Sequence, residues 1–339
     1  MKCRIITTIL CGTALWLSAG AAETSPAYNF LNVPSSTLSY GLGGLNISTV
    51  DDDVMNIDVN PALLGPEMGR VVGVNYMRYM GSSNFAGAKF ASGINERSAW
   101  GVGIQYYGYG SMKATDETGT IIGDFSPKDV AFSGYYSHDI YGGLRGGVAV
   151  KVLYSSYEAY SAVALATDLG INYYDPDKDL SLSLVVANLG GQVKRFTDSY
   201  DRLPIDVRIG WTQSFGSFPV RFSITAWNLT QWKLPYYDNG DGSAGSTPKL
   251  KESFISNLFR HLIFAADFVP NERFHIGIGY NHKVKTDMST WSRNFLSGFS
   301  LGAGLNVGRV GVGAAISAHH SGALTFMFNM SFLFSELMK

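Results

Sequence analysis

The chain has 339 residues, of which 16% are charged, and its 26 Lys and Arg residues nearly balance its 27 Asp and Glu residues. Soluble domains usually carry about 25% charged residues, and the chain lacks the basic excess expected of a nucleic-acid-binding protein. Glycine is abundant at 39 residues, aromatic residues make up 13% of the chain, and beyond the N-terminus there is no apolar run of about 18 residues that could form a transmembrane helix. This composition favours a β-rich chain with an apolar exterior.

The first 21 residues have the pattern of a secretory signal peptide. A short positive region is followed by an apolar stretch over residues 5–17 and by small residues at 19–21 that suit a cleavage site. Both cysteines, Cys3 and Cys11, lie in this segment. We therefore expect residues 1–21 to be removed, leaving a mature chain with no disulfide, zinc thiolate or cysteine nucleophile.

Residues 22–67 show no clear strand alternation, but they contain two turn signals. Gly43 and Gly44 permit a tight backbone turn. Asn60 and Pro61 predict the turn that leads from this segment into the strands that follow.

From about residue 69 the sequence alternates large apolar residues with small or polar ones at a period of two, which is typical of β-strands. The polar face carries mostly Gly, Ala, Ser and Asn, and the apolar face carries large side chains over strands of about 10 residues, as a membrane-spanning strand requires. The predicted strands are 69–80, 84–93, 97–108, 128–139, 143–155, 160–173, 179–189, 203–214, 217–230, 259–269, 272–283, 296–307, 309–319 and 322–334. Since every backbone group must be paired in a membrane, the sequence predicts that residues 68–339 form a closed, all-β, 14-stranded antiparallel transmembrane barrel.

The lengths of the connections support an even number of strands. If both ends of the barrel chain are periplasmic, the predicted periplasmic turns are short, and the long connections lie at the opposite end. These are 109–127, 190–202, 231–258 and 284–295. This asymmetry is typical of outer-membrane barrels.

Fourteen strands enclose more space than small inward side chains fill, so residues 22–67 are predicted to occupy the lumen as a hatch. Its sharpest polar cluster is Asp51, Asp52 and Asp53. The cluster suits either a moving latch or a fixed plug, and the fixed plug is favoured because buried charges need partners. The cations expected to face it are Lys151, Arg208 and Arg221.

Several motifs of the N-terminal segment occur in a recognisable order. They are Phe30-Leu31-Asn32 with Pro34, Gly43-Gly44, Asp51-Asp52-Asp53 and Asn60-Pro61-Ala62-Leu63-Leu64. The segment resembles the hatch of the FadL-like long-chain fatty acid transporters, which are fourteen-stranded barrels. Within that superfamily, which also includes the PorV-related barrels, the chain looks most like the PorQ family of the type IX secretion system.

The resemblance implies a non-enzymatic barrel in the outer membrane of a Gram-negative bacterium, with no cofactor. Barrels of the PorQ family belong to a cell-surface attachment complex that exports cargo proteins and attaches them to lipopolysaccharide. The implied partners are a PorZ-like surface protein, which the barrel anchors, and PorU-like and PorV-like components of the complex. The peptidase chemistry belongs to the PorU-like component.

The alternative function is a FadL-like channel for uptake of small hydrophobic molecules. That function requires an apolar pocket in the lumen and a lateral gap or a kinked hatch. The inward faces of the predicted strands are small and polar, which weakly disfavours it.

The sequence gives little support for a catalytic site or a metal site. His138-Asp139 could be a proteolytic dyad, but it falls at the predicted periplasmic end, where surface barrel proteases do not act. His319-His320 are neighbours on a strand and point to opposite faces, so they do not suit one metal. The run 238–242 lacks the glutamate that closes a calcium loop. We therefore expect no catalytic residue and no metal.

The longest connection, 231–258, is the predicted partner-binding site. Trp232, Tyr236 and Tyr237 are aromatic residues of the kind that anchor protein interfaces, and Asp241 lies among the flexible turn residues that follow. The aromatics could instead cover the mouth of the barrel, with Trp232 in the interfacial girdle.

Overall fold

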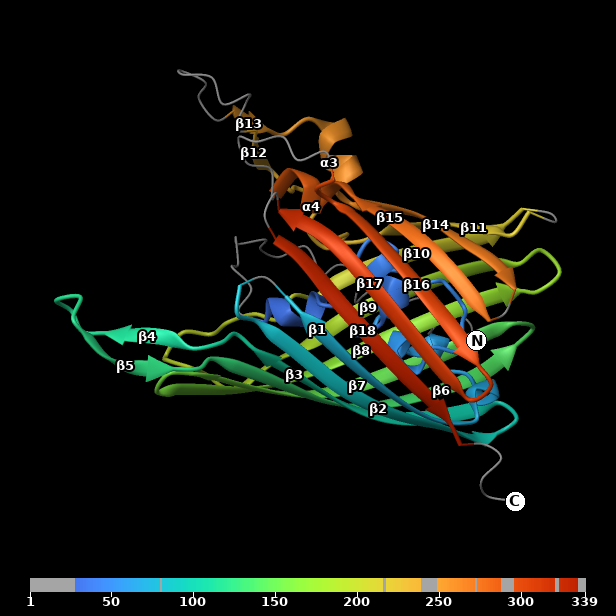
Figure 1. Cartoon of the computed structure of the whole chain (residues 1–339), viewed down its shortest axis with the longest axis horizontal. Helices are drawn as coiled ribbons and strands as arrows, with labels where there is room; N and C mark the ends of the chain where they lie inside the picture. The colour runs from blue at the N-terminus through green and yellow to red at the C-terminus, as the bar shows by residue number, and fades with distance from the viewer. Residues whose placement is uncertain are drawn as a thin grey trace, which may run out of the picture.

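A computed structural model describes residues 28–79, 81–215, 218–238, 249–271, 273–287, 296–320 and 323–334. Within these ranges, 14 antiparallel strands form one closed barrel, in which β1 pairs with both β2 and β18 (Figure 1). The strands of the barrel are β1 (Arg70–Arg78), β2 (Asn84–Asn95), β3 (Ser98–Gly108), β6 (Lys128–Tyr141), β7 (Leu144–Tyr157), β8 (Tyr160–Asp175), β9 (Leu180–Lys194), β10 (Asp206–Ser214), β11 (Val220–Ala226), β14 (Leu262–Asn271), β15 (Phe274–Asn281), β16 (Phe299–Val307), β17 (Val310–His320) and β18 (Ala323–Leu333). The structure confirms the predicted barrel and its strand number.

The alternation of side chains along β8 shows why the chain closes in this way. Leu165 and Leu169 point outward and are 46% and 48% exposed, whereas Ala164, Ala166 and Asp168 point inward and are buried. Because the outward face is apolar and the inward face is small or polar, only one face of each strand suits contact with lipid. No helix in the described ranges is both long and apolar enough to cross a bilayer.

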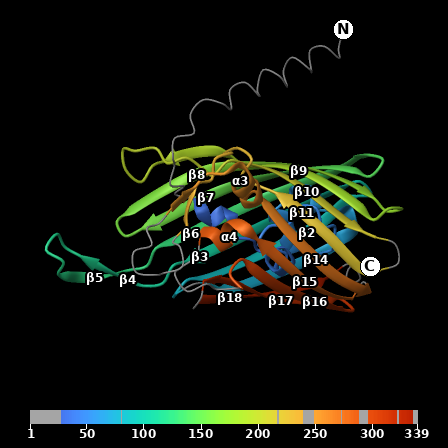
Figure 2. The same cartoon turned by 90° about the horizontal axis from the view of Figure 1, so that it is seen from above.

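The two ends of the barrel differ as the sequence predicts. One end, called here the short-turn end, has tight connections such as Gly142-Gly143 between β6 and β7, where both residues have positive φ angles of 57° and 82°. The opposite end, called the long-loop end, has the extended connections. One of these is not a plain loop, because β4 (Met112–Thr115) and β5 (Ile121–Phe125) form a hairpin that projects from the barrel (Figures 1 and 2).

Two predicted strand boundaries are wrong by several residues. β11 ends at Ala226 rather than at 230, because Asn228 has a left-handed φ of 55° and the chain turns away from the wall. β9 continues to Lys194 rather than ending at 189, since a bulge at Asn188 allows pairing with β8 to resume beyond it.

The long-loop end also contains elements that the sequence did not predict. They are the short strands β12 (Tyr236–Asp238) and β13 (Lys249–Lys251), and the helices α3 (Phe254–Arg260) and α4 (His282–Asp287).

Residues 28–68, called here the lumen segment, lie inside the barrel (Figures 1 and 2). Their elements are η1 (Asn29–Asn32), α2 (Thr37–Gly41), η2 (Val54–Asp58), η3 (Pro61–Leu63) and η4 (Pro66–Met68). Each of α2, η2 and η3 begins at a side chain that caps it, namely Ser36, Asp53 and Asn60. The boundaries of the signal peptide and of the mature hatch stay predictions, since residues 1–27 lie outside the described ranges.

The lumen segment supplies much of the buried apolar surface. Met55 and Ile57 are fully buried and pack against inward residues of β1, β2 and β3. Ile47 and Leu63 form a second cluster with Val185 of β9. Burial of each such side chain contributes about 1.5–3 kcal/mol, so the segment is fixed to the wall by packing as well as by polar contacts.

Candidate functional site: a divided lumen

Two spaces in the lumen lie on either side of α2, and a third, smaller one of about 30 Å³ lies beside Tyr107 and Lys151. The first, called here the outer cavity, has a volume of about 120 Å³ and lies toward the long-loop end, with Val33, Tyr40 and Trp227 in its lining. The second, called the inner vestibule, has a volume of about 390 Å³ and opens toward the short-turn end, where Arg273 and Arg309 line it. Tyr40 of α2 lines the outer cavity and Thr37 lines the inner vestibule, so the helix stands between the two spaces.

The outer cavity has a mainly apolar lining. Its apolar walls come from Val33, Pro34 and Leu45 of the lumen segment and from Trp227 and Val284 of the barrel mouth. Apolar cavities of about 150 Å³ in other proteins stay dry and bind benzene. The outer cavity is close to this size, and its surface is mainly apolar although Arg208 and Asn281 also line it, so it has room for one small, mainly hydrophobic molecule.

The helix α2 rests on a wall of glycine. A Cβ atom at Gly41 would lie 2.5 Å from the Cα atom of Gly302, so neither position has room for a side chain. The inward glycines of this wall, on β15, β16 and β17, are Gly277, Gly279, Gly302, Gly304, Gly311 and Gly313. Their lack of side chains allows α2 to approach the wall and leaves the space of the inner vestibule beside it.

Four hydrogen bonds tie the end of α2 to this wall. Ser300 Oγ donates to the Gly41 carbonyl at 2.9 Å and accepts from the Gly43 amide at 2.8 Å. Asn281 Nδ2 donates to the Gly43 carbonyl at 3.2 Å, and the Tyr40 hydroxyl bonds with Thr325 Oγ1. The chain then turns at Gly43 and Gly44, whose φ angles of 97° and 93° favour glycine.

A buried ion pair fixes the opposite side of the lumen segment. Lys89 Nζ of β2 lies 2.5 Å from Asp58 Oδ2 and donates to the Met55 carbonyl at 2.7 Å. Ser35 and Tyr135 also donate to the Asp58 carboxylate. Burial alone would raise the pKa of Asp58, but the positive charges of Lys89 and Lys151 and the hydrogen bonds to the carboxylate together hold that pKa below its usual value.

The three consecutive aspartates have different surroundings. Asp51 Oδ2 lies 3.8 Å from Arg221 Nη2, and Asp52 is exposed. Asp53 caps η2 through the Met55 amide and accepts from Ser36 at 2.5 Å.

The predicted partners of this cluster are only partly right. Arg221 lies near Asp51, but it also pairs with Asp267 at 2.6 Å. Lys151 and Arg208 pair instead with the strand carboxylates Asp168 and Asp206, at 2.5 and 2.7 Å. The reason is that each cation has an inward carboxylate nearby in the sheet, on the neighbouring strand β8 for Lys151 and on the same strand β10 for Arg208, which satisfies the charge locally.

Asn60 and Pro61 lie deeper in the lumen than the sequence predicts. Asn60 caps η3 and donates to the Ile47 carbonyl at 2.9 Å, so the pair organises the interior of the segment. The turn into the barrel comes later, at Gly69, which has a φ of 64°. The prediction that Asn60-Pro61 makes this turn is therefore wrong.

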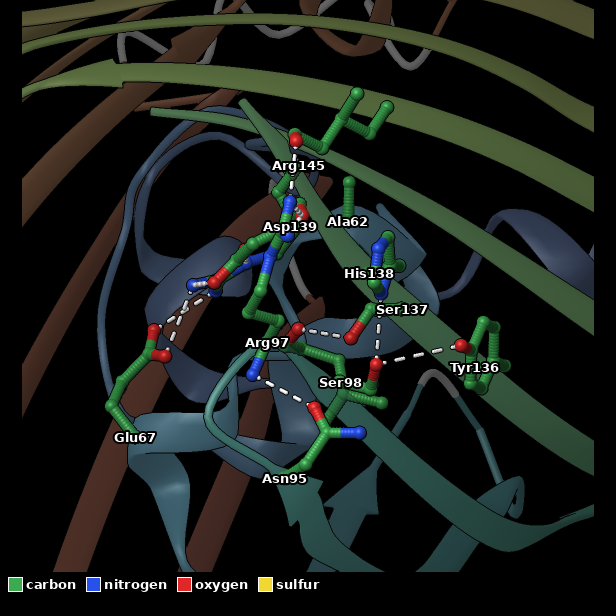
Figure 3. Close-up of polar contacts among 12 residues, drawn as sticks. Ala62, Glu67, Asn95, Arg97, Ser98, Tyr136, Ser137, His138, Asp139 and Arg145 are labelled. Atoms are coloured by element: carbon green, nitrogen blue, oxygen red, sulfur yellow. Dashed lines mark hydrogen bonds and ion pairs between the residues drawn. The ribbon is translucent and has the colours of Figure 1, made fainter. Parts of the chain in front are cut away.

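An ionic cluster at the short-turn rim holds the last part of the lumen segment. Arg145 of β7 makes two hydrogen bonds to Glu67 of η4, at 2.9 and 3.0 Å, and a third to Asp139 of β6 at 2.5 Å (Figure 3). Arg97 donates to the Asp139 carbonyl at 2.7 Å. This cluster is not apparent from the sequence, because Glu67, Asp139 and Arg145 are not all neighbours in the chain.

The residues considered for catalysis face different partners. His138 Nδ1 lies 2.8 Å from Ser98 Oγ, whereas the Asp139 carboxylate bonds to Arg145 (Figure 3). His138 and Asp139 therefore do not form a dyad. Within the described part of the chain, no group of three or more His, Cys, Asp and Glu residues is placed to hold a metal ion. The side chains of His319 and His320 lie outside the described residues.

The predicted partner-binding residues are only partly described. The Trp232 ring is 43% exposed and stacks on His261 with 4.9 Å between the ring centroids. The Arg260 guanidinium lies over the Tyr236 ring, with 4.7 Å between its Cζ atom and the ring centroid. The side chain of Tyr237 and the whole of Asp241 lie outside the described residues.

The wall beside the lumen segment is continuous. β3 pairs with β2 from Ser98 to Gly108 and with β6 over the same residues. The lateral gap expected of a transport barrel is therefore not present at this strand, and the described wall is a closed ladder of hydrogen bonds.

The sequence matches no family model and no curated protein. Solved structures do resemble the chain. The Ralstonia pickettii toluene transporter TbuX matches with a TM-score of 0.52 and 11% identity, over 89% of this chain and 98% of that chain. A Pseudomonas aeruginosa FadL homologue matches with a TM-score of 0.51 and 12% identity, over 88% and 98%. The Pseudomonas putida toluene transporter TodX has a TM-score of 0.51 and 11% identity, over 88% and 96%. The chain therefore has a FadL-like outer-membrane barrel fold.

Proposed function

We propose that this chain is an outer-membrane channel that admits small hydrophobic molecules, with its long-loop end outside the cell and its short-turn end in the periplasm. The observation that carries the proposal is the outer cavity, which has a mainly apolar surface with Arg208 and Asn281 also in its lining, lies within the barrel mouth and has a volume of about 120 Å³. The structural likeness to toluene transporters supports the same function. In this proposal the structure corresponds to the closed state of the channel.

Passage in this proposal requires movement of α2. A molecule in the outer cavity meets α2 and the Gly43–Gly44 turn before it can enter the inner vestibule. The helix is held to the glycine wall chiefly by hydrogen bonds from Ser300 and Asn281, which a small displacement breaks. The ion pair of Lys89 and Asp58 keeps the rest of the lumen segment in place meanwhile.

The test fills the outer cavity. Val33→Trp places a large ring in the cavity, and uptake of radiolabelled toluene by vesicles containing the full-length barrel should fall at least tenfold. Val193→Trp makes the same change on an exposed residue, which is 68% exposed, and should leave uptake unchanged. Equal uptake by wild type, both variants and empty vesicles would remove the channel function.

The second candidate function is the docking barrel of a type IX attachment complex, which presents a PorZ-like surface protein alongside PorU-like and PorV-like components. The N-terminal motifs favour it, and so does the hairpin β4–β5. Ile121 and Ile122 on this hairpin are 60% and 66% exposed, and its strands pair only with each other among the described strands. Exposed apolar residues of this kind suit a protein interface.

Isolation of the tagged chain from native outer membranes separates the two functions. The docking function predicts that a surface protein co-purifies and is lost when residues 112–125 are replaced by a short Gly-Ser turn. The channel function predicts that this replacement leaves toluene uptake intact.

A further inference from the structure

One buried cation of the barrel wall lines the outer cavity. Arg208 of β10 belongs to the lining of that cavity, and only 4% of its surface is exposed. Two contacts anchor its guanidinium: Nε donates to Asp206 Oδ2 at 2.7 Å, and Nη2 donates to Asn32 Oδ1 at 3.1 Å. Because a guanidinium is planar, these two contacts fix the direction of its remaining N–H groups.

These contacts leave part of the guanidinium without a partner. Arginine has five N–H donors in a rigid fork, and the bonds to Asp206 and Asn32 engage one donor on Nε and one on Nη2. Within the described part of the chain, Nη1 donates to no acceptor. It is not enclosed by protein either, unlike the unpartnered Nε atoms of Arg221 and Arg260. The Nη1 group of Arg208 therefore borders open space.

Of the spaces that Arg208 borders, only the outer cavity has room for an organic molecule. The third space of the lumen has a volume of about 30 Å³ and holds no more than a water or two. The outer cavity has a volume of about 120 Å³. The residues that line both spaces are Asn32, Val33, Pro34, Leu45 and Arg208, so the guanidinium is part of the partition between them.

The charge beside this guanidinium favours a neutral ligand over an anion. The Asp206 carboxylate is 3% exposed and already balances the charge of Arg208 at 2.7 Å. A second carboxylate would lie close to this one and be repelled by it. A neutral oxygen acceptor meets no such repulsion and still pairs the unused N–H group. A pure hydrocarbon would leave that group unpaired in a mainly apolar space, which costs free energy.

We propose that the outer cavity selects small neutral molecules with an apolar body and one carbonyl oxygen, and that Arg208 is the residue that recognises the oxygen. The apolar body lies among Val33, Leu45 and Trp227, and the oxygen accepts from the free side of the guanidinium. This inference rests on the proposed function, which assigns the outer cavity to the transported molecule. It adds a preference for an oxygen-bearing molecule over a hydrocarbon of the same shape.

The test compares two probes of matched shape on the full-length barrel in detergent micelles, with micelles that lack the barrel as the reference. The probes are cyclohexanone and methylenecyclohexane, which have the same ring and the same number of non-hydrogen atoms. One carries an oxygen where the other carries a methylene group. The measured quantity is the ratio of the two dissociation constants, whose change between variants does not depend on how the probes partition into micelles.

The variant removes the guanidinium together with its counter-charge. Arg208→Met alone would leave the Asp206 carboxylate buried and unpaired, so the double variant Arg208→Met/Asp206→Asn is used. It should shift the ratio about tenfold against cyclohexanone, since a hydrogen bond from a charged donor gives a discrimination of at least this size. In the wild type, the infrared carbonyl stretch of bound cyclohexanone should lie at a lower frequency than in empty micelles, and the variant should lose this shift.

The matched control makes the same exchange at a buried ion pair that does not line the outer cavity. Lys151→Met/Asp168→Asn removes the pair between β7 and β8, where Lys151 lines only the third space. This control should keep the wild-type ratio and the wild-type carbonyl frequency. Migration on gels that changes on heating verifies that each variant is folded.

Four results would overturn the inference. They are an unchanged ratio in the Arg208 variant, an equal shift in the Lys151 control, an unshifted carbonyl stretch in the wild type, and tighter binding of cyclohexanecarboxylate than of cyclohexanone. Each of these leaves the proposed function standing as long as the probes bind. Failure of every probe to bind above empty micelles would refute the outer cavity as a ligand site, and the proposed function with it.

Discussion

The two sides of the barrel hold the lumen segment in different ways. On the side of β2 and β6–β9, contact is made by ionic groups and dense packing, including the Lys89–Asp58 pair and the Arg145–Glu67 pair at the rim. On the side of β15–β17, α2 rests on glycine and is held by a few neutral hydrogen bonds. The outer cavity and the inner vestibule both adjoin this second side.

This difference indicates which part of the lumen segment can move at the lower cost in free energy. Breaking a buried ion pair leaves an uncompensated charge, whereas breaking a neutral hydrogen bond costs less free energy. A segment held firmly on one side and weakly on the other can move α2 without leaving the barrel.

The largest effect is expected on the ionic side. Asp58→Asn leaves the Lys89 ammonium, 2% exposed, without its counter-charge. We expect the free energy of unfolding to fall by about 3–5 kcal/mol, as for other broken buried pairs. Urea unfolding of the barrel in micelles, followed by tryptophan fluorescence, measures the change.

The matched control for this variant is Asp124→Asn, which breaks the exposed pair of Lys113 and Asp124 on the hairpin. Exposed pairs contribute about 0–1 kcal/mol, so this control should change little. Equal effects of the two variants would mean that the ionic side does not fix the lumen segment.

A smaller effect is expected on the glycine side. A Cβ atom at Gly302 would lie 2.9 Å from the Gly41 Cα atom, so Gly302→Val must displace α2. Overpacking of this kind costs about 1–3 kcal/mol. Because the rest of the segment stays fixed by Lys89, we expect the displaced helix to connect the two cavities and to raise single-channel conductance in planar bilayers.

Gly134→Val is the control for this prediction, since a Cβ atom at Gly134 meets nothing within 4 Å. It should match the wild type in both stability and conductance. Loss of stability in Gly302→Val with no rise in conductance would argue that α2 does not gate the lumen.

The strands could be predicted from the sequence, but the contacts that hold α2 against the wall could not, for a physical reason. Contact with lipid imposes a period of two on every strand, and that pattern is visible locally, as in the alternation of Leu165 and Ala166. By contrast, Ser300 is one small polar residue on an inward face like many others. Its importance comes from its bonds to Gly41 and Gly43, more than 250 residues away in the chain.

The same reasoning explains which charges were misassigned. The triple aspartate stands out in the sequence because its charges are adjacent, but the carboxylate of the lumen segment that binds the buried Lys89 is the isolated Asp58. The helix α3 was missed because its seven residues follow a long connection and show no extended helical period. Local pattern therefore predicts the wall, while contacts between distant residues determine what the lumen can do.

The smallest effect, and the sharpest test of the weakly held side, is expected from a single hydroxyl. Ser300→Ala removes the bonds to the Gly41 carbonyl and the Gly43 amide without adding volume. Both bonds are neutral, and the net contribution of a neutral hydrogen bond to stability is about 0.5–1.5 kcal/mol, so we expect a loss of only about 1 kcal/mol. The same change should raise the frequency of brief channel openings in planar bilayers, because α2 then leaves the wall more readily.

Ser82→Ala removes an exposed hydroxyl that bonds to the Tyr109 carbonyl at 3.2 Å and should alter neither stability nor the frequency of openings. An opening frequency in Ser300→Ala equal to that of Ser82→Ala would show that these two hydrogen bonds do not hold the channel closed.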